Sequence, residues 1–361
     1  MKTSALLYSV LALTATLVSA PSPSHAGVAQ GDAVLVARQL VVNHQYKGTG
    51  FAVVDTRGRE AYLMPPEEGV DRDPGSWSPA GTNIVFEVSR DDGLSRSHLW
   101  VMDRQGGGLR RITQGIGLRS QPVWGPGGIA YVENFNCLHV VGGQGQNHRR
   151  LFCLPEDGLI VRLQWSLDGK SVLFFGENEV GGGLEPPTDQ SIYRVDMRTG
   201  LATRIFLRRL NGPSSSRLYL SPDAAWAVDI NYDRAERFSL IELATGAESG
   251  LGIDGRSPVW SPDSQRLAFT GPFGVLYVMD AAARPSERRL RRLTSNPQDI
   301  TFVPVAWSRD GTCLLANRLH YVGTGENAYT VSDPVIFNLV TGERTRLPQG
   351  AAVEHGWFQH E

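Results

Sequence analysis

Two cysteines and a histidine in one stretch of the chain are the first candidates for a functional site. A hairpin expected to turn at Gly145 would set Cys137 and Cys153 directly opposite each other on neighbouring strands. In an exported protein such a pair forms a cross-strand disulfide or stays as two thiols, and the sequence leaves both open. A rival interpretation adds His139, on the same face as Cys137, as a third metal ligand. The same count puts His148 on the other face, which leaves the set short for zinc, so we expect no metal and no cofactor.

Sequence motifs that identify common enzymes are missing. The chain has no Gly-x-Ser-x-Gly elbow, no phosphate-binding Gly-x-x-x-x-Gly-Lys loop and no His-Glu-x-x-His pair. Its formal net charge of −2 also lacks the basic surplus of nucleic-acid-binding proteins. The sequence therefore leans against an enzyme, without deciding the point, and predicts no nucleic-acid partner.

Another group of candidates consists of polar residues that the repeat described below would gather on one side of the molecule. Long loops are expected between the second and third strands of four repeats, over residues 43–49, 89–97, 176–190 and 317–333. Variable loops on one rim of a regular scaffold are common binding surfaces. Two arginines from neighbouring repeats could also hold a carboxylate between them. The candidate binding residues are Arg162, Arg217, Glu354, Gln121, Asp91, Asp92, His320 and Glu326.

These side chains would be positioned by a repeat in which a tryptophan precedes a tight turn. In the turn, Pro presets φ, Asp bonds its own backbone and Gly accepts a positive φ, so the turn joins two antiparallel strands. Two more β-prone stretches follow in each repeat, which predicts the four antiparallel strands of a propeller blade. The repeats are anchored at Trp77, Trp124, Trp165, Leu220, Trp260, Trp307 and Trp357.

The number of anchors predicts an all-β propeller of seven four-stranded blades, with six as the alternative. Propeller repeats run about 40–50 residues, and seven such repeats fit the chain better than six. The last blade would be closed by both ends of the chain. The strand at Trp357 would then lie inside N-terminal strands at residues 33–42, 50–55 and 60–64.

Three segments resemble the TolB-type propeller repeat. They read LWVMDRQGGGLRRIT (Leu99–Thr113), SPVWSPDSQRLAFT (Ser257–Thr270) and LYVMDAAARPSERRLRRLT (Leu276–Thr294). The resemblance extends over most of residues 70–350 and implies a WD-repeat-like propeller without the N-terminal α/β domain of TolB itself. Similar repeats form binding propellers, the non-catalytic domains of prolyl peptidases and some polysaccharide lyases, so the family implies a fold more firmly than a function.

The first residues have the pattern of a cleaved signal peptide. Lys2 gives a positive start, Ala5–Val18 is an apolar run, and a small-x-small cleavage site ends at Ala26. We therefore expect a signal peptide over residues 1–26 and a single propeller domain over residues 27–361. The mature protein would be periplasmic or secreted.

The leading functional hypothesis is an exported, non-enzymatic scaffold that binds an envelope or extracellular protein or peptide on its long-loop face. It would be a monomer without membrane insertion. The alternative is a propeller enzyme, a lyase or hydrolase, with a metal or an acid–base site in the central funnel. A metal site there would need several histidines near the axis, whereas only His355 falls on an anchor strand.

Overall fold

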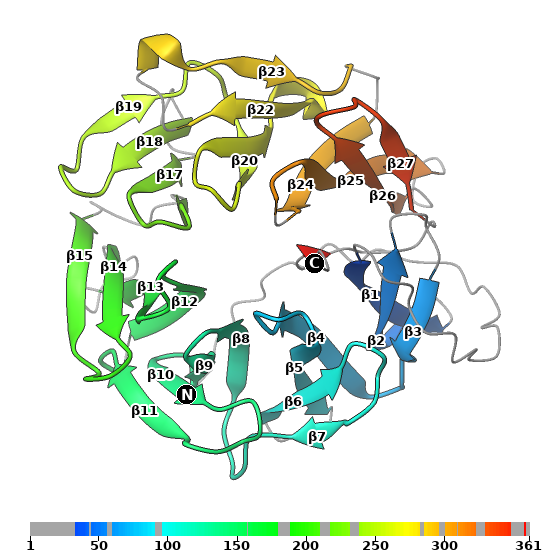
Figure 1. Cartoon of the computed structure of the whole chain (residues 1–361), viewed down its shortest axis with the longest axis vertical. Coiled ribbons are helices and arrows are strands. Elements are labelled where there is room, and N and C mark those ends of the chain that lie inside the picture. The colour runs from blue at the N-terminus through cyan, green and yellow to red at the C-terminus, as the bar shows by residue number, and fades with distance from the viewer. Residues whose placement is uncertain are drawn as a thin grey trace.

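The chain forms an all-β structure, described here from a computed structural model (Figure 1). The described residues are 33–42, 45–55, 60–90, 96–156, 158–179, 188–209, 217–231, 238–281, 285–295, 300–308, 310–322, 329–347 and 357–358. Within these ranges the helices are two 3-10 turns, η1 (Pro272–Gly274) and η2 (Pro285–Glu287). No helix among the described residues is long and apolar enough to cross a membrane. The predicted leader, residues 1–26, lies outside the described ranges.

Five sheets have four strands each, which follow one another in the chain and pair antiparallel. The first comprises β8 (Arg119–Gly125), β9 (Gly128–Glu133), β10 (Cys137–Val141) and β11 (Arg149–Cys153). The second comprises β12 (Gly158–Trp165), β13 (Ser171–Glu179), β14 (Thr188–Asp196) and β15 (Ala202–Arg209). The third comprises β16 (Arg217–Leu220), β17 (Trp226–Ile230), β18 (Phe238–Glu242) and β19 (Glu248–Gly250). The fourth and fifth comprise β20 (Arg256–Trp260), β21 (Arg266–Thr270), β22 (Leu276–Asp280) and β23 (Leu290–Arg292), then β24 (Ile300–Trp307), β25 (Cys313–Val322), β26 (Tyr329–Asn338) and β27 (Arg344–Arg346).

The remaining strands form one sheet of eight. They are β28 (Trp357–Phe358), β1 (Ala33–Val42), β2 (Gln45–Asp55), β3 (Glu60–Met64), β4 (Val70–Trp77), β5 (Asn83–Arg90), β6 (Ser97–Asp103) and β7 (Arg110–Arg111). One parallel pair, Gly48 with Val70, joins β2 to β4 and so links the two halves of this sheet. At its other end β28, from the end of the chain, pairs antiparallel with β1.

The sheets are arranged in a ring (Figure 1). The first strand of each four-stranded set lies toward the centre, and the fourth lies on the outside. This is a propeller-type arrangement, so the predicted all-β class and the predicted four-stranded antiparallel sheets are confirmed.

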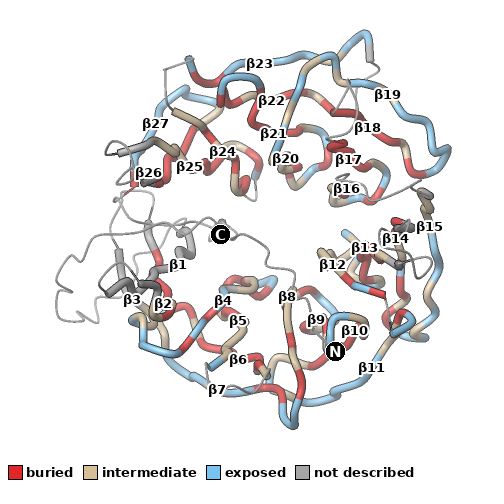
Figure 2. The backbone as a smooth tube through the Cα atoms, turned by 180° about the vertical axis from the view of Figure 1, so that it is seen from behind, coloured by how far each residue is buried: buried red, intermediate tan, exposed pale blue. Residues whose placement is uncertain are grey.

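The core lies between neighbouring sheets, where apolar residues of facing strands pack together (Figure 2). Val132 and Leu138 of the sheet β8–β11, for example, form one buried cluster with Val172 and Phe174 of the next sheet. Anchor tryptophans fasten these contacts, because their indole N–H groups donate to the first strand of the preceding sheet. The indole nitrogen of Trp165 lies 3.1 Å from the backbone oxygen of Val123. That of Trp260 lies 2.9 Å from the backbone oxygen of Tyr219, and that of Trp307 lies 3.0 Å from the backbone oxygen of Val259.

The turn after each anchor is closed by side chains as well as backbone. In the sheet β24–β27 the Ser308 hydroxyl donates to Asp310 Oδ1 at 2.6 Å and accepts from the Cys313 backbone N–H at 2.8 Å. The Ser–x–Asp pattern thus fixes the hairpin between the first and second strands, because Asp and Ser can satisfy backbone groups locally.

The predicted long loops are shorter than expected, because the flanking strands continue into them. β2 begins already at Gln45, and the β25–β26 pairing extends to Val322 opposite Tyr329. Paired backbone in a hairpin satisfies its own hydrogen bonds, so these segments need no irregular loop. The expected long-loop face is therefore built largely from extended hairpins.

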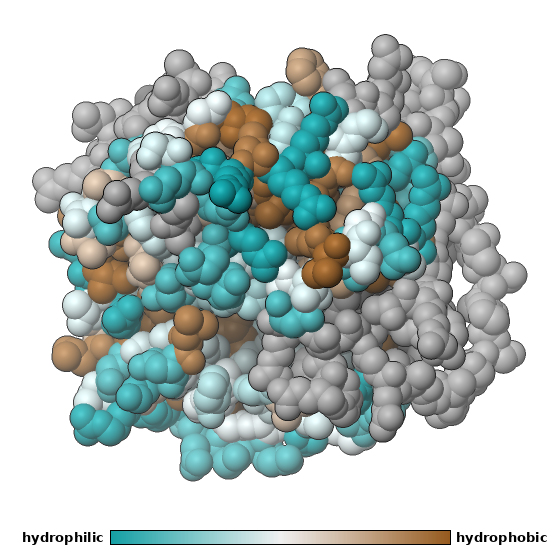
Figure 3. Space-filling view, turned by 45° about the horizontal axis from the view of Figure 1, so that its top comes forward, coloured by the Kyte–Doolittle hydropathy of each residue, from teal (hydrophilic) through white to brown (hydrophobic). Residues whose placement is uncertain are grey.

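The outer strands expose charge. In Figure 3 the side of the ring that carries β22 and β23 comes forward, and hydrophilic residues there interrupt the hydrophobic patches. Leu290, Arg291 and Arg292, which make up β23, are all exposed. Charged residues on an edge strand discourage pairing with other sheets.

Candidate acid–base site between two sheets

Two carboxylic acids lie side by side on the inner strands of the first sheet. Asp73 of β4 is the direct cross-strand partner of Glu87 of β5, so their side chains share one face of the sheet. Val85 and Leu99, on the same face, pack against Tyr131 and its neighbours in the sheet β8–β11. The pair therefore lies where two sheets meet, with Asp73 exposed and Glu87 partly buried.

The surroundings of Glu87 favour its neutral form. Burial, together with the neighbouring charge of Asp73, raises the pKa of Glu87 to about 7, against the lowering effect of a hydrogen bond with Ser97. A carboxyl with a pKa near neutrality can both donate and accept a proton at the pH at which most proteins work. Two acids in different environments are the usual arrangement for one acid and one base.

Ser97 and Arg119 connect this pair to the next sheet. The Ser97 hydroxyl donates to the backbone oxygen of Arg119 at 2.6 Å, and the Arg119 backbone N–H lies 2.7 Å from the same hydroxyl. The Arg119 side chain is only 3% exposed and meets Glu133 Oε1 at 2.8 Å. A buried guanidinium requires such partners, and here it ties β6 to β8 and β9.

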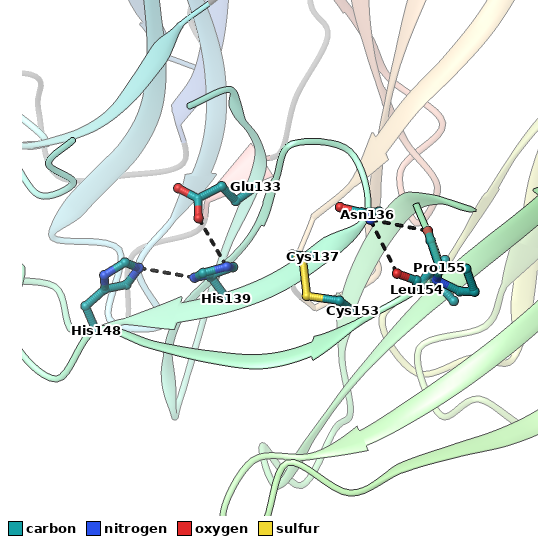
Figure 4. The surroundings of a disulfide bond; sticks show 8 residues. All are labelled: Glu133, Asn136, Cys137, His139, His148, Cys153, Leu154 and Pro155. Carbon is teal, nitrogen blue, oxygen red and sulfur yellow. Dashed lines mark hydrogen bonds and ion pairs between the residues drawn. A yellow bond between two sulfur atoms is a disulfide. The ribbon is translucent and has the colours of Figure 1, made fainter. Parts of the chain in front are cut away.

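A chain of polar rings continues outward from Glu133 (Figure 4). His139 Nε2 lies 3.2 Å from Glu133 Oε2, and His139 Nδ1 lies 3.3 Å from His148 Nε2. The Tyr131 hydroxyl contacts the same Nε2 of His148. Burial lowers the pKa of His139 to about 4 although Glu133 opposes the shift, so this ring is neutral over most of the pH range.

Cys137 and Cys153 are joined in the structure by a disulfide across β10 and β11, with Cα atoms 4.1 Å apart (Figure 4). The sequence count placed His148 on the face opposite His139, and the structure corrects this. The pairing passes from Leu138–Phe152 to His139–Arg150, so Leu151 is an extra residue in β11. A single-residue bulge reverses the alternation of the faces. His148 consequently lies on the side of His139.

Gln121 and Arg162, two of the predicted binding residues, are brought together. The Arg162 backbone N–H donates to Gln121 Oε1 at 2.6 Å. The Arg162 guanidinium donates to the Leu218 oxygen at 2.9 Å and lies 3.9 Å from the Tyr219 ring centroid. Arg162 thus reaches across to β16, the strand that begins with the exposed Arg217.

Charge is unevenly distributed over the innermost strands. β4 exposes the acids Asp71 and Asp73, whereas β16 and β20 expose Arg217 and Arg256. Between them β12 carries Arg162, which is partly buried. The exposed charges of these strands are therefore acidic on β4 and basic on β16 and β20.

His320, another predicted binding residue, lies on a different sheet from the Asp73–Glu87 pair. It is in β25, where its Nδ1 is 3.6 Å from Asp333 Oδ2, and Arg318 contacts the same carboxylate at 2.8 Å. A hollow of about 310 Å³ lies on the far face of β5 and β6, with His98 and Arg111 in its lining. Four predicted residues fall outside the described ranges: Asp91, Asp92, Glu326 and Glu354.

Sequence reasoning missed the two acids. A signal was present, because Glu87 interrupts the apolar run Ile84–Val88 that follows the turn after Trp77. A charged residue at a half-buried strand position is uncommon without a partner or a function. Asp73 had no such signal, since its partnership with Glu87 depends on the register of β4 against β5.

Comparison with known proteins gives similarity in fold only. No protein-family model and no curated protein matches the chain. An oligogalacturonate lyase solved in complex with manganese aligns with a TM-score of 0.60 at 16% identity, over 89% of this chain and 86% of its own. An oligogalacturonate lyase from Vibrio parahaemolyticus aligns with a TM-score of 0.60 at 13% identity, over 89% of this chain and 87% of its own. A putative 6-phosphogluconolactonase from Bacteroides uniformis aligns with a TM-score of 0.52 at 16% identity, over 90% of this chain and 97% of its own.

The first of these structures was solved in complex with manganese. Within the part of this chain that the structure describes, no three His, Cys, Asp or Glu side chains come together to hold a metal ion.

The hypothesis of a non-enzymatic scaffold is wrong. It rested on the expected long-loop face and on missing sequence motifs, whereas the similar structures include enzymes, namely two oligogalacturonate lyases and a putative 6-phosphogluconolactonase. The physical reason is that strand pairing brings side chains together without a contiguous motif. Asp73 and Glu87, on the consecutive strands β4 and β5, are paired in this way.

Proposed function

We propose that the chain is an enzyme, a lyase or hydrolase, that cleaves an acidic carbohydrate by acid–base chemistry at Asp73 and Glu87. The observation that carries the proposal is the direct pairing of these two acids, which leaves Glu87 with a pKa of about 7. Such a pair divides the work between a carboxylic acid and a carboxylate.

In the proposed reaction Glu87 donates one proton to the substrate and Asp73 accepts another. Protonated Glu87 donates its proton to the oxygen of the departing sugar, which breaks the carbon–oxygen bond. The Asp73 carboxylate takes a proton from water in hydrolysis, and the water oxygen forms the new bond. In elimination it takes the proton from the carbon beside the substrate carboxylate, and that electron pair forms a double bond.

An acidic substrate suits the guanidinium groups of the central strands. Arg217 and Arg256 are exposed there, and arginine binds carboxylates and phosphates through paired hydrogen bonds. The names of two of the similar structures fit such a substrate, since oligogalacturonate and 6-phosphogluconolactone are both acidic sugars, although others are peptidases. At these identities the likeness supports the fold, and the substrate remains part of the proposal.

We further propose that the ring has seven blades and that both ends of the chain share one of them. The support is the eight-stranded sheet, which divides into β28-β1-β2-β3 and β4-β5-β6-β7 at the single parallel pair between β2 and β4. The TolB-type character of the repeats and the export of the protein to the periplasm or medium also remain proposals, carried by the sequence patterns alone.

The test is an activity assay of the full chain on oligosaccharides of uronic acids, with a neutral oligosaccharide of equal length as the control substrate. We expect turnover of the acidic substrate only. Glu87→Gln should lower kcat about 10²–10⁴-fold, the usual contribution of a general acid or base. Glu156→Gln, at an exposed position far along the chain, serves as the matched control.

The product distinguishes the two reactions. Elimination gives an unsaturated, ultraviolet-absorbing sugar, whereas hydrolysis gives a saturated one with incorporated water oxygen. Full activity of Glu87→Gln would overturn the assignment of the acid, and turnover of the neutral substrate alone would overturn the substrate class.

A further inference from the structure

The Nε2 atom of His148 contacts two other side chains that can act as metal ligands, His139 and Tyr131. His148 Nε2 lies 3.3 Å from His139 Nδ1 and also contacts the Tyr131 hydroxyl. Tyr131 is fully buried and His139 is 7% exposed, whereas His148 is exposed. The group is thus anchored in the core and open to solvent on one side.

The contact with Glu133 determines which ring nitrogen of His139 carries the hydrogen. Glu133 Oε2 lies 3.2 Å from Nε2 of His139, and a carboxylate can only accept, so Nε2 carries the hydrogen. Nδ1 of the neutral ring then presents a lone pair to His148. Arg119 holds Glu133 from behind at 2.8 Å. A carboxylate behind a histidine is the usual support of a metal ligand.

The spacing of the two nitrogens fits a shared cation. Two metal–nitrogen bonds of about 2.0–2.1 Å at a tetrahedral angle put the nitrogens roughly 3.3–3.4 Å apart. The observed separation is 3.3 Å. The described residues hold no set of three His, Cys, Asp or Glu ligands, and here the third donor is a phenol oxygen instead.

We propose that Tyr131, His139 and His148 bind a divalent transition-metal ion, with zinc and copper as the ions that imidazole nitrogen suits best. The three side chains would leave a fourth position open to water on the exposed side. The disulfide Cys137–Cys153 lies on the same hairpin and holds β10 and β11, which carry or adjoin both histidines. The site lies outside the Asp73–Glu87 pair and does not depend on the proposed activity.

The experiment is calorimetric titration of the full chain, disulfide intact, with Zn²⁺. We expect one ion per chain and an affinity at least about tenfold lower in His148→Gln, since even second-sphere changes cost that much. His148 is exposed, so this variant should fold normally. His98→Gln, which removes a histidine of β6 outside the group, is the matched control and should bind like the wild type.

Spectroscopy with Co²⁺ in place of Zn²⁺ tests the ligands separately. Tyr131→Phe should alter the visible cobalt bands, and Glu87→Gln should leave them unchanged whatever its effect on turnover. Equal Zn²⁺ affinity in the wild type and His148→Gln, or the absence of binding in both, would overturn the proposal.

Discussion

At the scale of single residues, Glu87 is governed by its neighbours rather than by its own chemistry. Burial between two sheets and the charge of Asp73 both favour the protonated form, and the hydrogen bond with Ser97 only partly offsets them. Burial acts on His139 as well, where it lowers the pKa because it favours the neutral form of the ring. The fold thus keeps Glu87 partly protonated and His139 unprotonated near neutral pH.

Ser257 offers a test of backbone strain at the inner strands. Its φ is +52°, and Gln121 and Arg162 adopt +55° at the same position, three residues before their anchor tryptophans. The left-handed region costs a non-glycine residue about 1–2 kcal/mol, and glycine recovers part of this after its own entropy cost. Ser257→Gly should therefore stabilise the protein by about 0.5 kcal/mol in urea unfolding.

Ser120→Gly is the matched control, because Ser120 lies on an inner strand without a positive φ. At Ser120 only the backbone entropy that glycine loses on folding changes, so Ser120→Gly should destabilise the protein by about 0.5–1 kcal/mol. Effects of the same sign in both variants would contradict the assignment of strain to Ser257.

At the scale of the elements, strand periodicity could be predicted from the sequence and strand register could not. The turn residues set where each hairpin begins, and a four-stranded sheet contains each of the anchors Trp124, Trp165, Leu220, Trp260 and Trp307. The bulge at Leu151 has no signal in the residue types, yet it decides on which face His148 lies. The pairing of Asp73 with Glu87 was hidden for the same reason, since it depends on how β4 aligns with β5.

Hairpin length was the other element-scale feature that escaped prediction. Polar residues at positions 317–333 indicated a loop, but residues 317–322 and 329–333 continue β25 and β26 as paired strands in which Arg318 and Asp333 form an ion pair. A two-stranded extension tolerates polar side chains on both faces because solvent reaches both. Composition therefore does not separate such a hairpin from a loop.

At the scale of the whole molecule, the pairing of β28 with β1 predicts that the last residues of the chain stabilise the ring. A chain that lacks residues 357–361 loses the β1–β28 pairs Val34–Trp357 and Ala33–Phe358. It should unfold about 5 °C or more lower, since each kcal/mol shifts the midpoint of a domain this large by roughly 2–4 °C. Calorimetry of both chains measures the difference.

A chain that lacks only residues 359–361 keeps β28 and is the control. An equal midpoint for the two truncated chains would argue against closure of the ring by the C-terminal strand. The repeat predicted the ring because each repeat must bury its faces against neighbours. The function did not follow from the repeat, because the same ring serves several chemistries and the site lies in the contacts between sheets.

The central claim is that Glu87 is a carboxyl that titrates near neutrality beside Asp73. Infrared difference spectroscopy between the wild type and Glu87→Gln, recorded as the pH is raised, isolates the carbonyl stretch of this one group. The account predicts that the protonated band disappears with a midpoint near pH 7. A midpoint near the ordinary value of 4.5 would contradict it, because Glu87 would then be ionised and unable to donate a proton at neutral pH.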